Sequence, residues 1–322
     1  MAGLLGCAAA PGATDAESPN IELVKTLDAK GAFVSLEGRA LFLTSGFNTN
    51  AQQTGYWFDI GENPGSPAPV SASLPAAWQM AVSGDHAFVC DYTKFLTVCE
   101  MRDREFRQVA KLPMPSQTEN IIIRGAFAYI ANHTAGLTIV DISSPSRPTI
   151  VGNLNPKIDC DAVALSGDTA ILYGHWESRL VFADIRDPAN PRQVGVFQHD
   201  PKTFNQGEMA VDNDLAYCTA VNGLVIVNVA DPANPKLASA VPLDVPTTDV
   251  AVMDGIAFVA CRDGVRVYGV RDPALPVEMG HYPCPASQLA VRRAHADSGT
   301  GYHIYAANKR GPAMVLRFHR RE

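Results

Sequence analysis

One phrase recurs along the chain at nearly constant spacing, and it constrains the fold more than any other feature. An apolar run ends at a polar residue, a Pro-x-x-Pro segment follows, and a second apolar run begins. The clearest copies are GLTIVDISSPSRPTIVG from Gly136, RLVFADIRDPANPRQVGVF from Arg179, GLVIVNVADPANPKLASAVP from Gly223 and GVRVYGVRDPALPVEMGHY from Gly264. A period of about 42 residues made of short apolar runs is typical of β-propeller blades rather than of helical solenoids.

The residues that end the apolar runs count the units. They are Asp59, Glu100, Asp141, Asp184, Asn228, Gly269 and Arg317. Each unit divides into four short strands, as in the unit with Val250–Asp254, Ile256–Ala260, Val265–Val270 and Val277–Tyr282. We therefore predict an all-β fold, a seven-bladed β-propeller of four-stranded blades that spans residues 21–322. The apolar run is the third strand, packed between neighbouring blades, and the prolines lead into the outermost strand, where a missing N–H costs little.

The final unit has no fourth strand after AMVLRFHRR, whereas SPNIELVKTLD at Ser18–Asp28 precedes the first unit without a partner. This segment shares its proline and its apolar spacing with Asn234–Asp244, which is an outermost strand in the predicted scheme. We therefore expect the N-terminal strand to pair with the last blade and to close the ring.

Residues 1–20 are predicted to form a flexible tether outside the propeller. The segment Leu4-Leu5-Gly6-Cys7 followed by small and polar residues resembles the cleavage region of a bacterial lipoprotein signal, although only six residues precede the cysteine. One interpretation is lipidation of Cys7 in a chain that starts inside its signal, and the other is an incidental cysteine. We expect a location in the cell envelope, whether periplasmic, lipid-anchored or extracellular.

Charge and hydropathy exclude two classes of partner. The net charge is −7 and the sequence has no basic cluster, so we expect no nucleic acid partner. No apolar run reaches the roughly 18 residues that a membrane span requires. Contact with a membrane is therefore expected only through an N-terminal lipid anchor.

The phrases GLTIVDISSP and GLVIVNVADPANP resemble the LVIVD-repeat family, whose name matches the third strand. Recognisable copies run from about Gly55 to Tyr282, and the first, second and seventh units are degenerate. The resemblance implies a β-propeller, commonly on bacterial or archaeal cell surfaces. It implies no catalytic residues, because the motif concerns folding.

Candidate binding residues lie where the chain enters the innermost strand of each blade. In a propeller these entering loops share one face with the loops between the second and third strands, and this loop face usually carries the ligand. The residues at the start of the inner strands form a predicted polar ring: Gln79, Asn120, Asp161, Glu208, Asp249 and Gln288. The ring is either the hydrated mouth of the channel or a site for a hard cation or a cationic ligand. Tyr92 and Trp176 are predicted on the same face, where they could stack on a sugar or anchor a protein.

Three loop histidines suggest an alternative site. His133, His175 and His199 are predicted in one sector of the loop face, where imidazoles could hold a divalent metal ion. Asp161 or Glu208 would then be the general base. None of these histidines has a local ligand spacing such as HxxxH.

The sequence thus supports a non-catalytic binding module whose loop face recognises a protein, a glycan or a small molecule, without a cofactor. The alternative is a metal-dependent lyase or hydrolase on the same face. A structural scaffold without a ligand is the third reading, and it predicts a loop face without a deep pocket.

Overall fold

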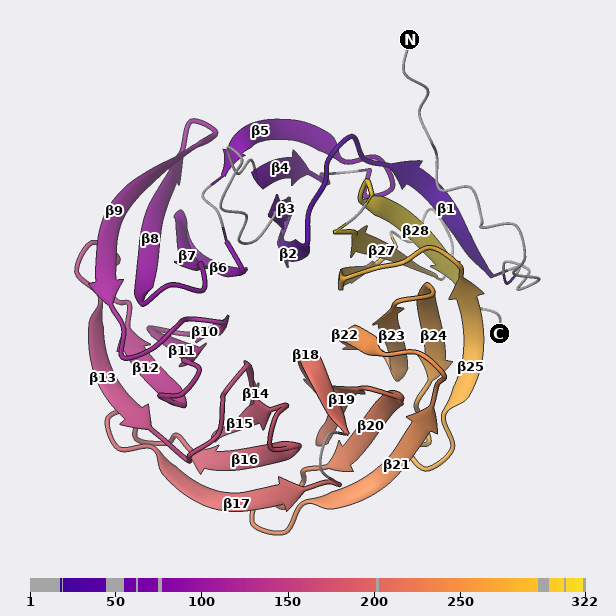
Figure 1. Ribbon diagram of the computed structural model, residues 1–322. Helices are drawn as coiled ribbons and strands as arrows, with labels where there is room; N and C mark the ends of the chain where they lie inside the picture. Colours follow the sequence, from indigo (N-terminus) through magenta and orange to yellow (C-terminus); the bar gives the residue numbers. More distant parts are fainter. Residues whose placement is uncertain are drawn as a thin grey trace.

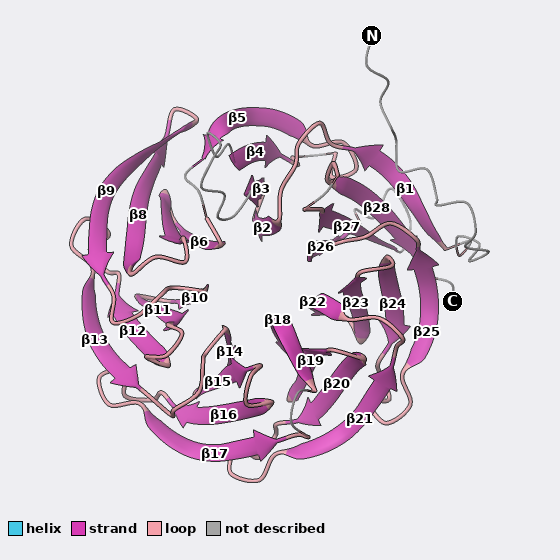
Figure 2. Ribbon diagram, in the orientation of Figure 1, coloured by secondary structure: helices cyan, strands magenta, loops and turns pink. Residues whose placement is uncertain are grey.

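Each repeat unit folds into one four-stranded antiparallel sheet, and seven such sheets stand around a central axis as the blades of a β-propeller (Figure 1). This computed structural model describes residues 18, 20–44, 55–61, 63–74, 77–200, 203–294, 301–309 and 311–320. Figure 2 shows strands and loops throughout this described part of the chain. Cys7 and most of the predicted tether lie outside it. The seven-bladed, all-β prediction is confirmed.

The strands of each blade follow the chain from the axis outward. Blade 1 contains β2 (Phe33–Glu37), β3 (Ala40–Thr44), β4 (Gly55–Asp59) and β5 (Ala68–Leu74). Blade 2 contains β6 (Gln79–Ser83), β7 (His86–Cys90), β8 (Phe95–Arg102) and β9 (Glu105–Pro113). Blade 3 contains β10 (Asn120–Arg124), β11 (Phe127–Ala131), β12 (Leu137–Asp141) and β13 (Thr149–Leu154). Blade 4 contains β14 (Ala162–Ser166), β15 (Thr169–Gly174), β16 (Arg179–Asp184) and β17 (Arg192–Gln198).

The remaining three blades have the same order. Blade 5 contains β18 (Phe204–Asp212), β19 (Leu215–Ala220), β20 (Gly223–Asn228) and β21 (Lys236–Pro242). Blade 6 contains β22 (Thr247–Met253), β23 (Ile256–Cys261), β24 (Val265–Gly269) and β25 (Val277–Tyr282). Blade 7 contains β26 (Gln288–Arg293), β27 (Gly301–Ala307), β28 (Met314–His319) and, outermost, β1 (Ile21–Thr26).

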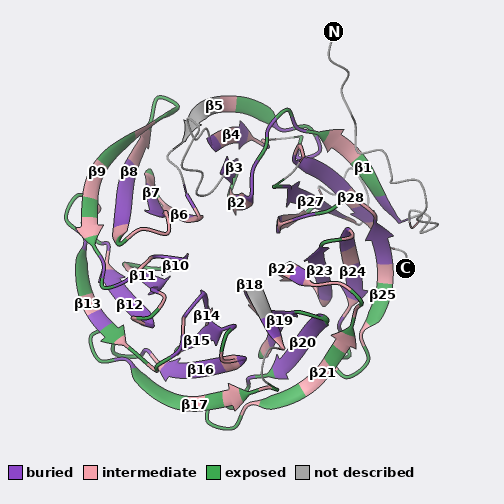
Figure 3. Ribbon diagram, viewed as in Figure 1, coloured by how far each residue is buried: buried purple, intermediate pink, exposed green. Residues whose placement is uncertain are grey.

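The third strand of a blade is buried on both faces, as β20 illustrates. Val225 and Val227 pack into the cluster shared with blade 4, whereas Leu224 and Ile226 pack into the cluster shared with blade 6. Alternate side chains of a strand point to opposite faces, so a continuous apolar run serves both interfaces. Figure 3 shows the middle strands buried and the outermost strands largely exposed.

The Asp-Pro-Ala-Asn-Pro segment forms a turn held by its own side chains. In blade 5, Asp231 accepts a hydrogen bond from the Ala233 N–H at 3.0 Å and another from the Asn234 side-chain amide at 2.9 Å. Such Asx turns fix the chain direction before the outermost strand. The turn thereby places the second proline directly before β21.

The same turn also joins neighbouring blades. A Cβ atom at Gly195 in β17 would overlap the carbonyl oxygen of Pro232, and one at Gly152 in β13 would overlap that of Pro188. Strands β13 and β17 therefore each carry a glycine where the proline turn of the next blade lies against the backbone. In β21, Ser239 takes this place, and its hydroxyl donates to the Pro273 carbonyl at 2.5 Å.

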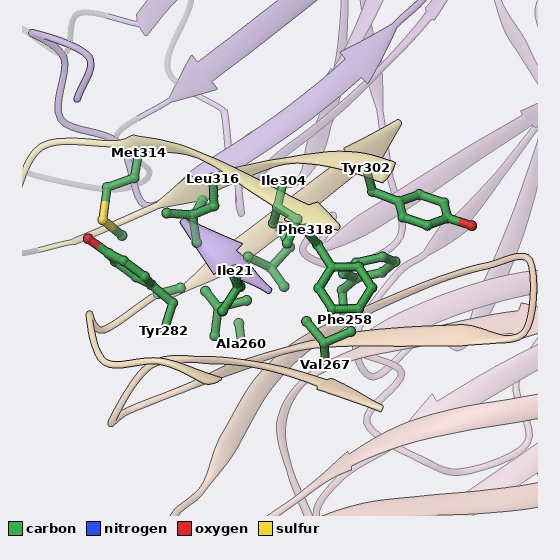
Figure 4. Close-up of a cluster of buried hydrophobic side chains, with 14 of the residues drawn as sticks. Ile21, Phe258, Ala260, Val267, Tyr282, Tyr302, Ile304, Met314, Leu316 and Phe318 are labelled. Atoms are coloured by element: carbon green, nitrogen blue, oxygen red, sulfur yellow. The ribbon is translucent and has the colours of Figure 1, made fainter. Parts of the chain in front are cut away.

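Strand β1 closes the ring, as predicted from the sequence. It pairs antiparallel with β28, with Ile21 opposite Phe318 and Thr26 opposite Met314. Figure 4 shows Ile21 among side chains of blades 6 and 7, which include Phe258 and Leu316. The two ends of the propeller thus share one sheet.

No helix in the part of the chain that the structure describes is long and apolar enough to cross a membrane.

Candidate functional site

The six residues of the predicted polar ring all lie near the same end of the inner strands. Gln79, Asn120 and Gln288 are the first residues of β6, β10 and β26, and Asp161 directly precedes β14. Glu208 and Asp249 lie inside β18 and β22, Glu208 within an irregularity of the strand pairing and Asp249 directly after one.

Some ring residues join adjacent blades. Asp249 accepts a hydrogen bond at 2.6 Å from the backbone N–H of Leu289 in blade 7. Gln288 accepts one at 2.7 Å from the backbone N–H of Val34 in blade 1. These side chains fix the spacing of inner strands that otherwise do not pair with each other. Part of the polar ring is therefore structural.

Glu208 makes a longer connection, across the channel. Its carboxyl oxygens accept hydrogen bonds from the side-chain amides of Gln79 at 2.9 Å and Asn120 at 3.0 Å. Glu208 belongs to blade 5, whereas its partners belong to blades 2 and 3. Glu208 and Gln288 line two cavities, one of about 520 Å³ and one of about 320 Å³. The Glu208 bridge stands between them.

The larger cavity, called the mouth cavity below, opens on the loop face. Its walls include the residues directly before ring positions, among them Trp78, Glu119 and Ser287, together with the loops around Arg262 and Lys309. The smaller cavity is lined by residues that follow the ring in the inner strands, such as those of β26.

Aromatic rings form a continuous series beside the mouth cavity. The ring centroids of Phe33 and Trp78 are 4.7 Å apart, and those of Trp78 and Tyr92 are 5.1 Å apart. Tyr92 in turn meets the His133 ring edge-on at 6.3 Å. Tyr92 and His133 occupy equivalent loops of blades 2 and 3, and both have left-handed backbone, with φ of 62° and 43°. Each such conformation costs on the order of 1 kcal/mol, so the surrounding contacts hold it in place.

Three carboxyl groups line the floor of the mouth cavity: Glu119, Asp161 and Glu208. Glu119 is 3% exposed, and burial with the nearby Asp161 and Glu208 raises its pKa to about 9. Burial in the channel and the neighbouring Asp249 raise the pKa of Glu208 to about 8. Both groups therefore carry protons at neutral pH.

Two histidines lie against these carboxyl groups. His175 Nδ1 is 2.5 Å from a carboxyl oxygen of Asp161, which also accepts the His175 backbone N–H at 3.1 Å. His133 lies between Glu119 and Asp159, with a nitrogen 3.7 Å from an oxygen of each.

The third predicted histidine has a different partner. His199 Nδ1 is 2.9 Å from the hydroxyl of Thr203. Within the residues covered by the structure, which include all three histidines, no group of three His, Cys, Asp or Glu side chains is arranged to hold a metal ion. The structure therefore does not assemble His133, His175 and His199 into the metal site expected from the sequence.

Of the two aromatic residues predicted on this face, Tyr92 belongs to the series of rings at the mouth cavity. Trp176 is 69% exposed and has its ring centroid 4.6 Å from that of His175. Trp176 therefore lies on the surface of blade 4 and does not line the mouth cavity.

Sequence reasoning missed several residues that line the mouth cavity: Phe33, Trp78, Glu119, Arg262 and Lys309. A signal for two of them was present, because Trp78 and Glu119 directly precede the ring residues Gln79 and Asn120. Residues directly before an inner strand lie at the end of the channel that opens on the loop face, so these two could have been expected beside the ring. Lys309 lies in the degenerate last unit, between β27 and β28, and had no such signal.

Comparisons with solved structures agree with the fold. A putative 6-phosphogluconolactonase from Bacteroides uniformis matches with a TM-score of 0.68 and 13% identity, covering 86% of this chain and 95% of the other. The Pseudomonas aeruginosa periplasmic gluconolactonase PpgL matches with a TM-score of 0.64 and 14% identity, covering 77% and 83%. The WD40 domain of Toxoplasma gondii coronin matches with a TM-score of 0.68 and 10% identity, covering 95% and 85%. At these identities the likeness concerns the fold alone.

Sequence comparison identifies the repeat itself. No curated protein matches the chain. The family model for the LVIVD repeat matches residues 76–99, 115–155 and 207–242, which lie in blades 2, 3 and 5. The resemblance found in the sequence is thus confirmed in these three segments, and the chain is a seven-bladed β-propeller that contains LVIVD repeats.

Proposed function

We propose that this propeller is a binding module that takes a small molecule into the mouth cavity. The observation that carries the proposal is the cavity itself, about 520 Å³ at the end of the channel, with the Phe33–Trp78 pair in its wall. Pockets of roughly 300–1,000 Å³ with aromatic walls and a few convergent polar groups are typical of small-molecule sites. A protein or glycan partner would instead use exposed groups such as Trp176.

The architecture suits binding, because the groups around the cavity are held by contacts of their own. Glu208 is fixed by two amides from the opposite side of the channel, and Asp161 is fixed by His175. A ligand would meet a site that is already formed, which lowers the entropic cost of binding.

Two tryptophans allow a matched test. We would screen a fragment library of neutral, cationic and anionic compounds by ligand-observed NMR against the wild type, Trp78→Ala and Trp176→Ala. We expect compounds that lose about tenfold or more in affinity with Trp78→Ala, because an aromatic wall contributes that much at a buried site. Trp176→Ala should bind them as the wild type does.

The opposite pattern would refute the proposal. Binding that depends on Trp176 and not on Trp78 would move the site to the surface of blade 4, and the absence of any binder that depends on Trp78 would leave the cavity without a function. Thermal melting shows whether Trp78→Ala is folded, and Trp78→Leu, which keeps an apolar side chain, serves as the second variant.

We also propose a location in the cell envelope, which rests on the LVIVD resemblance and on the sequence around Cys7. Expression in a bacterial host with a labelled fatty acid, of the chain preceded by a positively charged and apolar signal segment and followed by fractionation, tests it. The proposal expects label in the wild type and none in Cys7→Ser. Label in neither, with the protein in the cytoplasm, would refute it.

The metal-dependent lyase or hydrolase stays a second prediction from the sequence, and the arrangement of its three histidines does not favour it. Elemental mass spectrometry of the purified protein, with melting before and after chelation, tests it directly. Stoichiometric metal and a melting temperature lowered by the chelator would support that alternative.

A further inference from the structure

Two positively charged side chains, Arg262 and Lys309, line the mouth cavity. Arg262 follows β23 in blade 6 and Lys309 follows β27 in blade 7, so both belong to loops of adjacent blades on the loop face. Neither forms an ion pair with any residue that the structure describes. By contrast, Arg266, in the same blade as Arg262, pairs with Asp263 at 2.5 Å and with Glu278 at 3.3 Å.

The acidic groups of the cavity do not supply the missing charge. Asp161 is paired with His175, and the carboxyl of Glu208 accepts two amides. Glu119 is buried beside His133 and, like Glu208, carries a proton at neutral pH because its pKa is raised to about 9. Arg262 and Lys309 therefore remain without a carboxylate partner among the described residues of the cavity.

Lys309 also shows where a ligand would lie. Its ammonium group is 5.6 Å from the ring centroid of Phe33 and 6.0 Å from that of Trp78. At an exposed site such a cation–π contact is worth only about 0.5–1 kcal/mol, less than a hydrogen-bonded ion pair in a cavity. A flat molecule beside Phe33 and Trp78 would bring an anionic substituent next to the ammonium group.

We propose that the mouth cavity binds a small organic anion, a carboxylate or a phosphate ester carried on a flat ring, with Lys309 and Arg262 as its counter-charges and the Phe33–Trp78 pair as its stacking surface. This inference rests on the proposed function, because it names the class of ligand that the same cavity takes. It predicts selection by charge as well as by shape.

The test uses four probes with the same ring and different charge: benzoate, phenyl phosphate, benzyl alcohol and benzylamine. Isothermal titration calorimetry at low salt should show benzoate or phenyl phosphate binding about tenfold or more tightly than the neutral and cationic probes. The comparison of benzoate with phenyl phosphate decides between a carboxylate and a phosphate. Added salt should weaken the binding of the anion.

Variants of the exposed Lys309 test whether this side chain is a counter-charge of the bound anion. Lys309→Met should weaken binding of the anion about tenfold, and Lys309→Arg should restore most of it. The control is Lys111→Met, since Lys111 has a similar cation–π contact, 4.4 Å above Phe95, but lies on the outermost strand β9. This control should bind as the wild type does.

The outcomes separate this inference from the proposed function. If benzylamine or benzyl alcohol binds as tightly as the anions and depends on Trp78, the cavity is a binding site but its preference for anions is refuted. Unchanged affinity in Lys309→Met, or no binding of either anionic probe, also refutes the inference. If the fragment screen in addition finds no binder that depends on Trp78, the proposed function fails with it.

Discussion

The pKa of the Glu119 carboxyl group is set mainly by burial. Glu119 is 3% exposed, its nearest basic group is His133 at 3.7 Å, and Asp159, Asp161 and Glu208 surround it. Its pKa is raised from 4.5 to about 9, so the folded protein binds a proton that the unfolded chain releases across this range. Where the folded state binds more protons, stability falls as pH rises.

We therefore predict that wild-type stability declines from about pH 5 to about pH 9, and that Glu119→Gln declines less, by up to about 5 kcal/mol at the upper end. The neutral amide has the shape of the protonated carboxyl and never ionises. Urea unfolding at three pH values measures the difference. Glu208 and Asp249 stay in both proteins, so parallel pH profiles would show that Glu119 is not the group that titrates.

Among the elements, the outermost strand and the proline turn of the next blade form a joint that recurs from blade 3 to blade 6. Gly195 in β17 lies against the carbonyl of Pro232, with no room for a Cβ atom. Gly167, in the turn between β14 and β15 of the same blade, has φ of +51° and open space around it. The two glycines are needed for different reasons, one for contact and one for backbone conformation.

We predict that Gly195→Ala lowers the free energy of unfolding by about 3 kcal/mol, because the backbone of the next blade cannot move aside. Gly167→Ala should cost about 1 kcal/mol, for the left-handed backbone alone. Urea unfolding of both variants checks this. Equal losses would show that the joint relaxes around the added methyl group.

These elements also show which structural features can be predicted from the sequence and which cannot. The third strand and the proline turn were predictable, because strand alternation and Asx-turn chemistry act within a few residues. The contact at Gly195 was not predictable from the sequence. Gly195 and Pro232 belong to different repeat units, and nothing within either unit indicates that the two residues meet. At the site, the ring positions followed from the repeat, but Lys309 did not, because nothing in its own segment indicates the aromatic pair in blades 1 and 2.

For the whole molecule, the ring is held closed by a single strand from the other end of the chain. Ile21 is 3% exposed among residues of blades 6 and 7, whereas Leu23, on the same strand, is 44% exposed. We predict that Ile21→Ala destabilises the protein by about 3 kcal/mol and that Leu23→Ala changes its stability by less than about 0.5 kcal/mol. Thermal and urea unfolding measure both, and a small effect of Ile21→Ala would show that β28 holds blade 7 without β1.

Closure by β1 affects the state of the nascent chain during synthesis. A ribosome releases β1 first, yet its partner β28 emerges only after the other blades have been translated. During that interval β1 has no sheet edge to join, while the completed blades already expose faces meant for the missing one. A nascent chain that stalls before β28 would thus present two open faces and a loose strand, features that attract chaperones and proteases.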